Sequence, residues 1–193
     1  MIDQGIKSRP QYEPLRPDPA GKRHLLLVAE PTERPDAFLA AELDVETWIV
    51  VPRDAEGVAG IPLPGQGGPR RFRSPRQMLD CLAPRLAQER MGLRLYATGR
   101  EDFLWEIDGI ARRAGMGKGE IQLAHAGSHA RRIFCVHCRT YNEGVTTTIV
   151  RCGGCGAHLF VRDHFSRRLS AFMGVKVDAE TPGDVPPAEQ AYR

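Results

Sequence analysis

Two cysteine pairs, CVHC at residues 135–138 and CGGC at residues 152–155, decide the fold of the C-terminal third of the chain. Two residues between the cysteines of a pair let one short turn direct both sulfurs at a single ion. Two such turns that face each other form the tetrahedral four-sulfur cage that zinc prefers and that a single iron also accepts. The glycines around the second pair permit the positive φ angles and close backbone approach of such a turn. We therefore predict one metal ion held by four thiolates: Cys135, Cys138, Cys152 and Cys155.

The segments beside the cysteine pairs have the composition of β-strands. Residues 145–150 (VTTTIV) are β-branched throughout, which favours a strand, and residues 158–161 (HLFV) offer a partner strand after the second pair. Strands that flank two cysteine turns are typical of a β zinc-ribbon or rubredoxin-like metal module.

The alternative use of these cysteines is two disulfides, which need an oxidising compartment. The N-terminal residues MIDQGIKSRPQYEP have no apolar signal core, so we expect a cytoplasmic protein and a metal site. Zinc is favoured over iron because Arg139 stands where a rubredoxin usually has glycine. Iron stays open, since rubredoxin-type sites use the same four thiolates. His137 is expected to point outward, and Cys81 to be a small buried hydrophobe.

The charge and hydropathy of the chain set outer limits. The 193 residues carry 27 Lys and Arg against 24 Asp and Glu, a net charge of +3 that demands neither a nucleic acid nor a membrane partner. No apolar run approaches the roughly 20 residues that span a bilayer. The length fits one domain with a small metal module.

Changes in composition divide the chain into four segments. Residues 1–22 and 177–193 are polar and rich in proline, which predicts extended arms. Residues 23–130 alternate strand and helix signals, and residues 131–176 contain the metal module.

The segment 23–130 predicts a small, open, mostly parallel α/β sheet. Residues 24–29, 47–51, 93–97 and 121–123 are the expected strands. Helices are expected over residues 36–43 and 101–114 and from Pro75, capped by Ser74, with Pro84 kinking or splitting that helix.

The α/β segment is Rossmann-like in its pattern but lacks a phosphate-binding loop. Residues 29–38 (AEPTERPDAF) follow the first strand without the glycines that let backbone amides cradle a pyrophosphate. The turn at residues 98–100 could still face an anion, but it serves equally well to turn the chain. We expect a degenerate nucleotide site.

A dense cluster of ionisable residues follows the metal module's last expected strand. It comprises Arg162, Asp163, His164, Arg167 and Arg168. Arginine forks and a histidine offer planar donors to carboxylates, haem propionates or an acidic partner, so the cluster is a candidate interface. The alternative is a solvated turn in which Asp163 caps a short helix that begins at His164.

Two resemblances add to this interpretation. Residues 93–116 (LRLYATGREDFLWEIDGIARRAGM) look like the end of the nicotinamide domain of ferredoxin-reductase-like proteins. The cysteine pairs, with VRDHFSRR at residues 161–168, MGV at 173–175 and DAE at 178–180, resemble the C-terminal domain of the small DmmA-type subunit of dimethylamine monooxygenase.

The second resemblance implies a function. It suggests an accessory subunit of an enzyme that oxidatively demethylates dimethylamine to methylamine and formaldehyde, with O₂ and NADPH. It also implies a haem-bearing catalytic partner and a reductase-like partner with FMN and a [2Fe–2S] cluster. This chain has no cluster-binding cysteine run of that kind and no nucleotide fingerprint. We therefore expect a structural or electron-coupling role, without catalytic residues.

A second functional hypothesis is a free-standing zinc-ribbon module that binds nucleic acid or protein. The sequence of the module shows no basic and aromatic stripe of the kind found in nucleic-acid binders, which disfavours that use. His125 and His129, four residues apart, raise the possibility of a second metal site, but the residues between them are typical of a loop.

Overall fold

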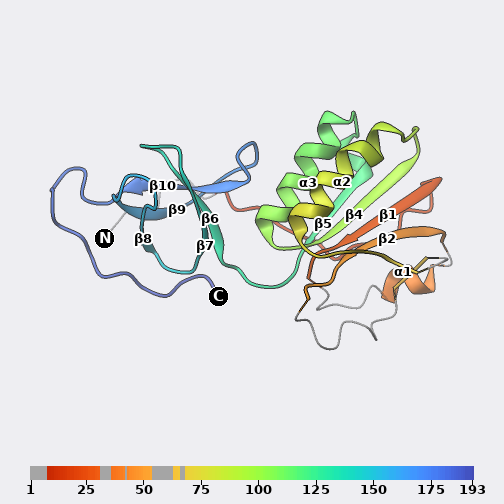
Figure 1. The fold of residues 1–193 in the computed structure, drawn as a ribbon, viewed down its shortest axis with the longest axis horizontal. Coiled ribbons are helices and arrows are strands. Elements are labelled where there is room, and N and C mark those ends of the chain that lie inside the picture. Colours follow the sequence, from red (N-terminus) through yellow and green to blue (C-terminus); the bar gives the residue numbers. More distant parts are fainter. Residues whose placement is uncertain (1–7, 31–35, 42, 54–62, 66–67) are drawn as a thin grey trace. The chain divides into compact units, whose positions relative to one another are not determined.

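The computed structural model describes residues 8–30, 36–41, 43–53, 63–65 and 68–193. It divides into two compact units. One is Tyr12–Gly127, and the other consists of Ser128–Arg193 together with Met1–Gln11. Each unit has its own five-stranded sheet (Figure 1). We call the first the α/β unit and the second the ribbon unit. Within the described ranges, no helix combines the length and the apolar character that crossing a membrane requires.

The α/β unit contains the predicted parallel sheet, which confirms the fold class. Its strand order is β3-β2-β1-β4-β5, and all neighbours pair in parallel. The strands are β1 (Arg23–Val28), β2 (Val45–Val50), β3 (Arg70–Phe72), β4 (Leu93–Gly99) and β5 (Ile121–His125). The helices are α1 (Asp36–Ala40), α2 (Pro75–Ala87) and α3 (Glu101–Arg113), with a short 3₁₀ turn, η2, at Lys118–Glu120.

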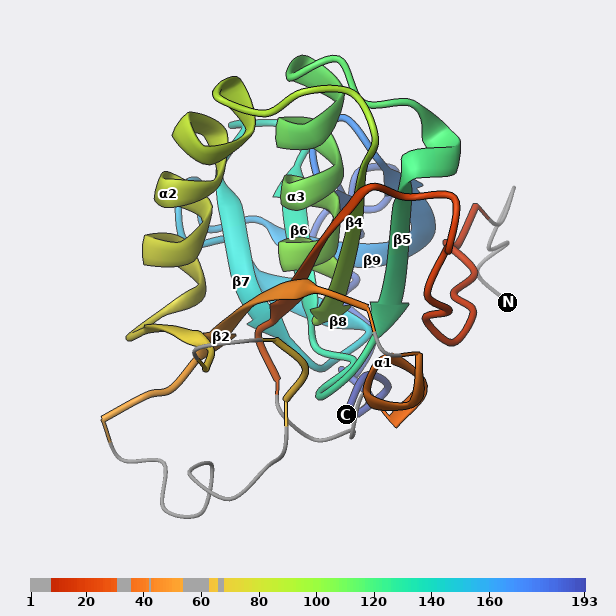
Figure 2. The ribbon, with the colours of Figure 1, turned by 90° about the vertical axis from the view of Figure 1, so that its right-hand side faces the viewer.

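Helices cover both faces of this sheet, which explains its continuous apolar strands. The helices α2 and α3 lie side by side on one face, and α1 lies on the other (Figure 2). Alternate residues of β1 accordingly belong to different cores: Leu25 and Leu27 pack with α2 and α3, and Leu26 packs with Phe38 of α1.

The helix boundaries follow local chemistry, with two differences from expectation. Ser74 caps α2 as predicted, because its Oγ accepts a hydrogen bond from Gln77 N at 3.2 Å. Pro84 lies inside α2 without splitting it, since the helix continues to Ala87. The helix after β1 is shorter than predicted and ends at Ala40.

The strand order reverses between β1 and β4, the position where dinucleotide-binding sheets hold their ligand. Here Gly99 serves packing: a Cβ on it would lie 2.9 Å from Ala29 Cβ and 2.9 Å from Phe103 Cδ1. The first turn of α3 carries Glu101 and Asp102, which disfavour an anion at this helix N-terminus.

Part of the N-terminal segment belongs to the α/β unit. The backbone N–H of Asp18 donates to the hydroxyl of the buried Tyr96 at 2.9 Å. The Asp18 carboxylate pairs with Arg94, and this hydrogen bond holds the pKa of Asp18 below its usual value. Tyr12 packs against the core under α2 and α3. The segment is thus fixed to the sheet although it has no regular secondary structure.

The ribbon unit is a second sheet with strand order β7-β6-β10-β9-β8. Its strands are β6 (Arg131–Cys135), β7 (Tyr141–Val145), β8 (Ile149–Arg151), β9 (His158–Ser166) and β10 (Ala171–Lys176). β10 runs parallel to β6, and the other neighbours are antiparallel. The expected C-terminal β module is confirmed.

Two local predictions in this unit are wrong. Residues 145–150 are not one strand: β7 ends at Val145 and β8 begins at Ile149. The threonines between them pair instead with the C-terminal segment, through a bridge between Thr147 and Gln190 and a 2.9 Å hydrogen bond from Thr148 N to Glu189 O. The backbone groups of these threonines therefore pair with the C-terminal segment and do not continue a strand of the five-stranded sheet.

The short helix expected from His164 is also absent. β9 continues to Ser166 and forms a hairpin with β10, in which Phe165 stands opposite Phe172. The rings of these two residues meet edge to face with centroids 4.9 Å apart. Phe165 and Phe172 are thus cross-strand neighbours, and their packing stabilises a hairpin in place of the helix.

Candidate metal centre

The four cysteine sulfurs converge as the sequence predicts. All four lie within 4.8 Å of one another, close enough to bind one metal ion. The Cys135–Cys155 sulfurs are 3.9 Å apart and the Cys138–Cys152 sulfurs 3.6 Å apart. Four sulfurs about 2.3 Å from a central zinc are separated by about 3.8 Å in a tetrahedron, so these spacings fit a tetrathiolate site.

Each cysteine pair forms the same turn. Cys135 ends β6 and Cys152 follows β8, and both are buried, whereas Cys138 and Cys155 are exposed. In the first turn Arg139 N donates to Cys135 O at 2.9 Å, and in the second Gly156 N donates to Cys152 O at 3.0 Å. The two turns are therefore near-repeats that present one buried and one exposed sulfur each.

Arg139 adopts the conformation that favours glycine. Its φ is 64°, close to the 74° of Gly156 at the equivalent place in the second turn. Arg139 thus takes nearly the same φ as the glycine at the equivalent place in the second turn.

Asn142, on β7, supports the centre and was not predicted from the sequence. Its Oδ1 accepts a hydrogen bond from Gly153 N at 2.8 Å, and its Nδ2 lies 3.8 Å from Cys152 Sγ. Asn142 thereby links the β6–β7 hairpin to the second cysteine turn. Its position in the chain follows no ligand spacing, so no sequence signal marks it.

Gly154 is required by packing against the centre. A Cβ at this position would lie 2.2 Å from Thr140 Oγ1 and 3.0 Å from Cys138 Sγ. Gly153 differs, because its Cβ would meet only Asn142 Oδ1 at 3.7 Å. Of the two glycines between Cys152 and Cys155, only Gly154 is therefore required by packing.

The thiols differ in acidity. A hydrogen bond from the side chain of Thr140 lowers the pKa of Cys138 to about 6. Burial raises the pKa of Cys135 to about 11. Burial also acts on Cys152, but hydrogen bonds from the backbone of Cys155 and Gly154 outweigh it and lower its pKa. Metal binds the deprotonated form of each, so loading the centre releases protons.

The histidines considered from the sequence lie outside this centre. His137 is exposed within the first turn and is not in the four-sulfur group. His125 ends β5 of the α/β unit, with its ring 5.9 Å from that of Tyr12. His129 belongs to the ribbon unit, where its backbone N–H donates to the backbone carbonyl of Arg193 at 2.8 Å. Among the described residues these two form no metal-binding group.

Asp163, one of the five candidate interface residues, is committed to an internal contact. Its carboxylate binds Arg131 Nη2 at 2.6 Å. The Arg131 side chain is 3% exposed, and its guanidinium lies between the rings of Phe172 and Tyr192, 3.9 and 3.8 Å from their centroids. This ion pair joins β6 to β9, so the contact of the Asp163 carboxylate is structural.

The other four candidate interface residues differ in exposure. Arg162 is half-buried on β9, and His164 is exposed with its Nδ1 3.5 Å from Ser8 Oγ. Arg167 and Arg168 are exposed in the turn between β9 and β10. The hairpin thus brings three of the four to its surface.

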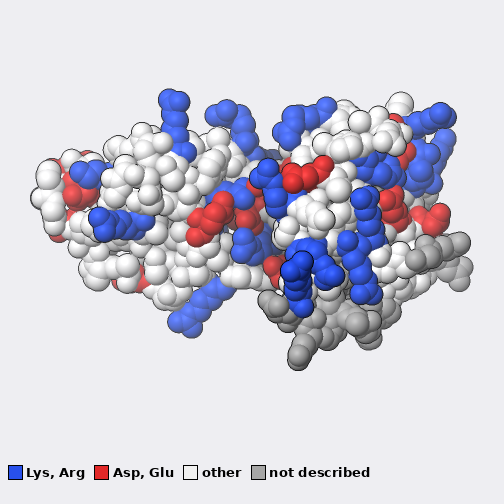
Figure 3. Space-filling view, in the orientation of Figure 1, with Lys and Arg blue, Asp and Glu red and all other residues white. Residues whose placement is uncertain are grey.

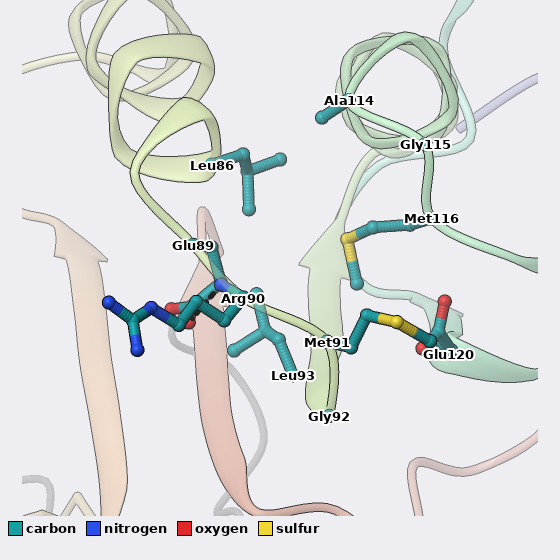
Figure 4. A pocket seen from close by; sticks show the side chains of 10 residues that line it. All are labelled: Leu86, Glu89, Arg90, Met91, Gly92, Leu93, Ala114, Gly115, Met116 and Glu120. Carbon is teal, nitrogen blue, oxygen red and sulfur yellow. Dashed lines mark hydrogen bonds between the residues drawn. The ribbon is translucent and has the colours of Figure 1, made fainter.

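The α/β unit has a cavity of about 280 Å³ between the ends of α2 and α3 (Figure 4). Leu86, Met91 and Met116 give it an apolar wall, and Glu89 and Glu120 lie at its sides. It adjoins Leu93, at the amino end of β4. Ligands of open α/β sheets bind at the opposite, carboxyl ends of the strands, so this cavity is not a nucleotide site of that kind.

Comparison with known proteins places these features in a family. The model of the C-terminal domain of dimethylamine monooxygenase subunit DmmA-like proteins matches residues 132–175, the segment that carries all four cysteines. The chain is 33% identical over 177 residues to the heme-dependent oxidative N-demethylase delta subunit of Ectopseudomonas mendocina (strain ymp), which covers 91% of both chains. No solved structure matches. The chain therefore belongs to the family of DmmA-like subunits of oxidative N-demethylases.

Proposed function

We propose that the chain is the accessory subunit of a dimethylamine monooxygenase that converts dimethylamine to methylamine and formaldehyde with O₂ and NADPH. The observation that supports this most directly is the similarity to an N-demethylase delta subunit over 91% of both chains. The family model that matches the cysteine-bearing segment also carries dimethylamine monooxygenase in its name.

In this proposal the chain holds a metal but performs no chemistry on the amine. Cys135, Cys138, Cys152 and Cys155 bind one zinc, which has no redox chemistry and would fasten the turn after β6 to the turn after β8. Iron on the same thiolates is the alternative, and it would allow an electron-coupling role.

The oxygen and redox chemistry would reside on partner subunits: a haem-bearing catalytic subunit and a reductase-like subunit with FMN and a [2Fe–2S] cluster. The four clustered cysteines of this chain are the only group of that kind among its described residues, and they suit a single ion. The α/β unit has the strand order of dinucleotide-binding domains, but its switch point lacks a glycine-rich turn.

Contacts with these partners would use the β9–β10 hairpin. Arg162, His164, Arg167 and Arg168 are the side chains we propose there, since guanidinium groups bind carboxylates in two-pronged fashion. Asp163 would act indirectly, by fixing β9 through Arg131.

The proposal is tested by reconstitution. The purified chain and its candidate partner subunits are mixed, and NADPH-dependent formaldehyde release from dimethylamine is measured with and without this chain. Co-elution of the subunits, with activity that requires this chain, is the expected result. Full activity in its absence, together with separate elution, would contradict the proposal.

A further inference from the structure

A row of partly buried apolar side chains crosses one face of the ribbon sheet. Strand register defines it: Phe134 stands beside Tyr141 on β7 and Met173 on β10, and Val175 stands beside Phe160 on β9. Residues directly opposite each other in neighbouring strands share a face of the sheet. We call this row the apolar belt, defined by Phe134, Tyr141, Phe160, Met173 and Val175.

The apolar belt is not the core of the ribbon unit. The other face of the same strands carries the core: Ile133, Leu159, Val161, Phe165 and Phe172, each 6% exposed or less. The belt residues are all more exposed than these, and Tyr141 is 43% exposed. The rings of Phe134 and Tyr141 meet edge to face with centroids 5.3 Å apart, so the belt is continuous at this end.

Basic residues outnumber acidic ones among the strands that carry the belt. Residues 131–176 carry eight Lys and Arg but two Asp and Glu, whereas the rest of the chain carries nineteen against twenty-two. In the view of Figure 3 the ribbon unit shows separate Lys and Arg side chains, and some Asp and Glu side chains, on a largely uncharged surface. The excess of basic residues is thus confined to residues 131–176, since residues 177–193 of the same unit add four Asp and Glu against one Arg.

Three arginines share the face of the belt. Arg132 precedes Phe134 by two residues on β6, and Arg162 follows Phe160 by two residues on β9. Arg151 stands opposite His158, which precedes Phe160 by two residues. Within the described parts of the chain, Arg132 pairs with Glu143, but no carboxylate pairs with Arg151 or Arg162. Two cations thus remain for an external partner.

The linear sequence shows no basic and aromatic stripe, whereas in the sheet arginines and aromatic side chains share one face. Its aromatic residues come from three strands, β6, β7 and β9, and its arginines come from β6, β8 and β9. Neighbours on the face are therefore distant in the sequence, and linear inspection does not bring them together.

We propose that the apolar belt, with Arg151 and Arg162 at its edge, docks an acidic surface of a partner subunit of the N-demethylase. An apolar centre of Met and aromatic side chains with arginines at the margin has the composition of a protein interface. The aliphatic Met173 and Val175 at the middle of the belt give no ring on which a base could stack, which disfavours single-stranded nucleic acid. The inference rests on the proposed function and specifies the surface through which that function is exercised.

The test compares two matched charge reversals in the full chain. Arg151→Glu with Arg162→Glu alters the belt's edge, and Arg113→Glu with Lys118→Glu changes the net charge equally on exposed positions of the α/β unit. A third variant, Tyr141→Ser, removes the most exposed aromatic of the belt without changing charge. Metal content and the unfolding midpoint of each variant establish that the ribbon unit is intact.

The measured quantity is the affinity for the partner subunits by biolayer interferometry at two salt concentrations. We expect at least a tenfold loss of affinity in Arg151→Glu/Arg162→Glu and in Tyr141→Ser, no loss in the α/β control, and weaker binding of the wild type at high salt. Unchanged affinity in both belt variants would overturn the inference while leaving the proposed function intact. Failure of the wild type to bind any partner subunit would instead overturn the proposed function.

Two further outcomes also overturn the inference. If the wild type forms a homodimer that the belt variants convert to monomer, the belt binds a second copy of this chain. If a single-stranded RNA oligonucleotide binds the wild type and not the belt variants, the occupant is nucleic acid. Sedimentation velocity and fluorescence anisotropy, run on the same four proteins, distinguish these cases.

Discussion

Arg131 and Tyr192 stack on each other, with the guanidinium carbon 3.8 Å from the centroid of the phenol ring. Arg131 begins the ribbon's β6, and Tyr192 is the second-last residue of the chain. Backbone hydrogen bonds support the stack, because Ala191 N and Tyr192 N both donate to Thr146 O at 2.9 Å. The end of the chain is thereby a part of the ribbon unit.

Removal of this stack should weaken the ribbon unit. Tyr192→Ala deletes a cation–π contact on a buried cation and is expected to lower the free energy of unfolding by about 1–2 kcal/mol. Tyr192→Phe keeps the ring and is the control. Urea unfolding monitored by far-UV circular dichroism measures the free energy of unfolding of both variants. Equal destabilisation by the two variants would assign the effect to the hydroxyl and not to the ring.

Gly154 should be far less tolerant of substitution than Gly153. Gly154→Ala forces a Cβ to within 2.2 Å of Thr140 Oγ1 and against the Cys138 sulfur, so we expect reduced metal occupancy. Gly153→Ala meets only one side-chain oxygen, at 3.7 Å, and should keep its metal. Elemental analysis of the two purified variants gives the comparison, and equal occupancy would argue against the geometry of the second turn.

Asn142 should increase the metal affinity of the centre without being a ligand itself. Asn142→Ala removes the acceptor for Gly153 N and the contact with Cys152 Sγ. Loss of such outer hydrogen bonds typically costs 10- to 100-fold in metal affinity, and we expect about that range here. Competition with a chromophoric chelator measures it. Glu143→Gln, next along β7, is the control, and the prediction fails if both variants release metal alike.

The N-terminal segment should contribute a pH-dependent part of the stability of the α/β unit. The Arg94 hydrogen bond lowers the pKa of Asp18 in the folded state, so its contribution is complete above the unfolded pKa and is lost as the pH falls through the folded pKa. Asp18→Asn should therefore be less stable than wild type at neutral pH, and the difference should shrink at about pH 3.

Urea unfolding at the two pH values checks this sign. Asp80→Asn, whose carboxylate is exposed in a pair with Arg76, is the control and should show little effect at either pH. A difference between Asp18→Asn and wild type that grows on acidification would contradict the assignment.

The sequence predicted those features that depend on local spacing or on continuous patterns. The cysteine intervals predicted the cluster of four sulfurs because two-residue gaps constrain the turn whatever surrounds it. The apolar runs of β1 and β2 indicated a sheet buried on both faces, and Ser74 marked the start of α2.

Features that depend on pairing between distant segments could not be predicted. Residues 146–148 look like the middle of a strand, and only their pairing with residues 189–192 interrupts it. A short helix from His164 was an alternative in the sequence, yet the cross-strand contact of Phe165 with Phe172 favours a hairpin. Asn142 and the apolar belt likewise arise from register between strands.

Elemental analysis with a visible absorption spectrum of the purified chain tests most directly whether the four cysteines bind one metal ion. We predict one zinc per chain in a colourless protein whose ribbon unit unfolds when Cys152 is changed to alanine. Stoichiometric iron with visible absorption would indicate a redox-active iron at this site and not a structural zinc. A natively folded chain that contains no transition metal would contradict the central claim.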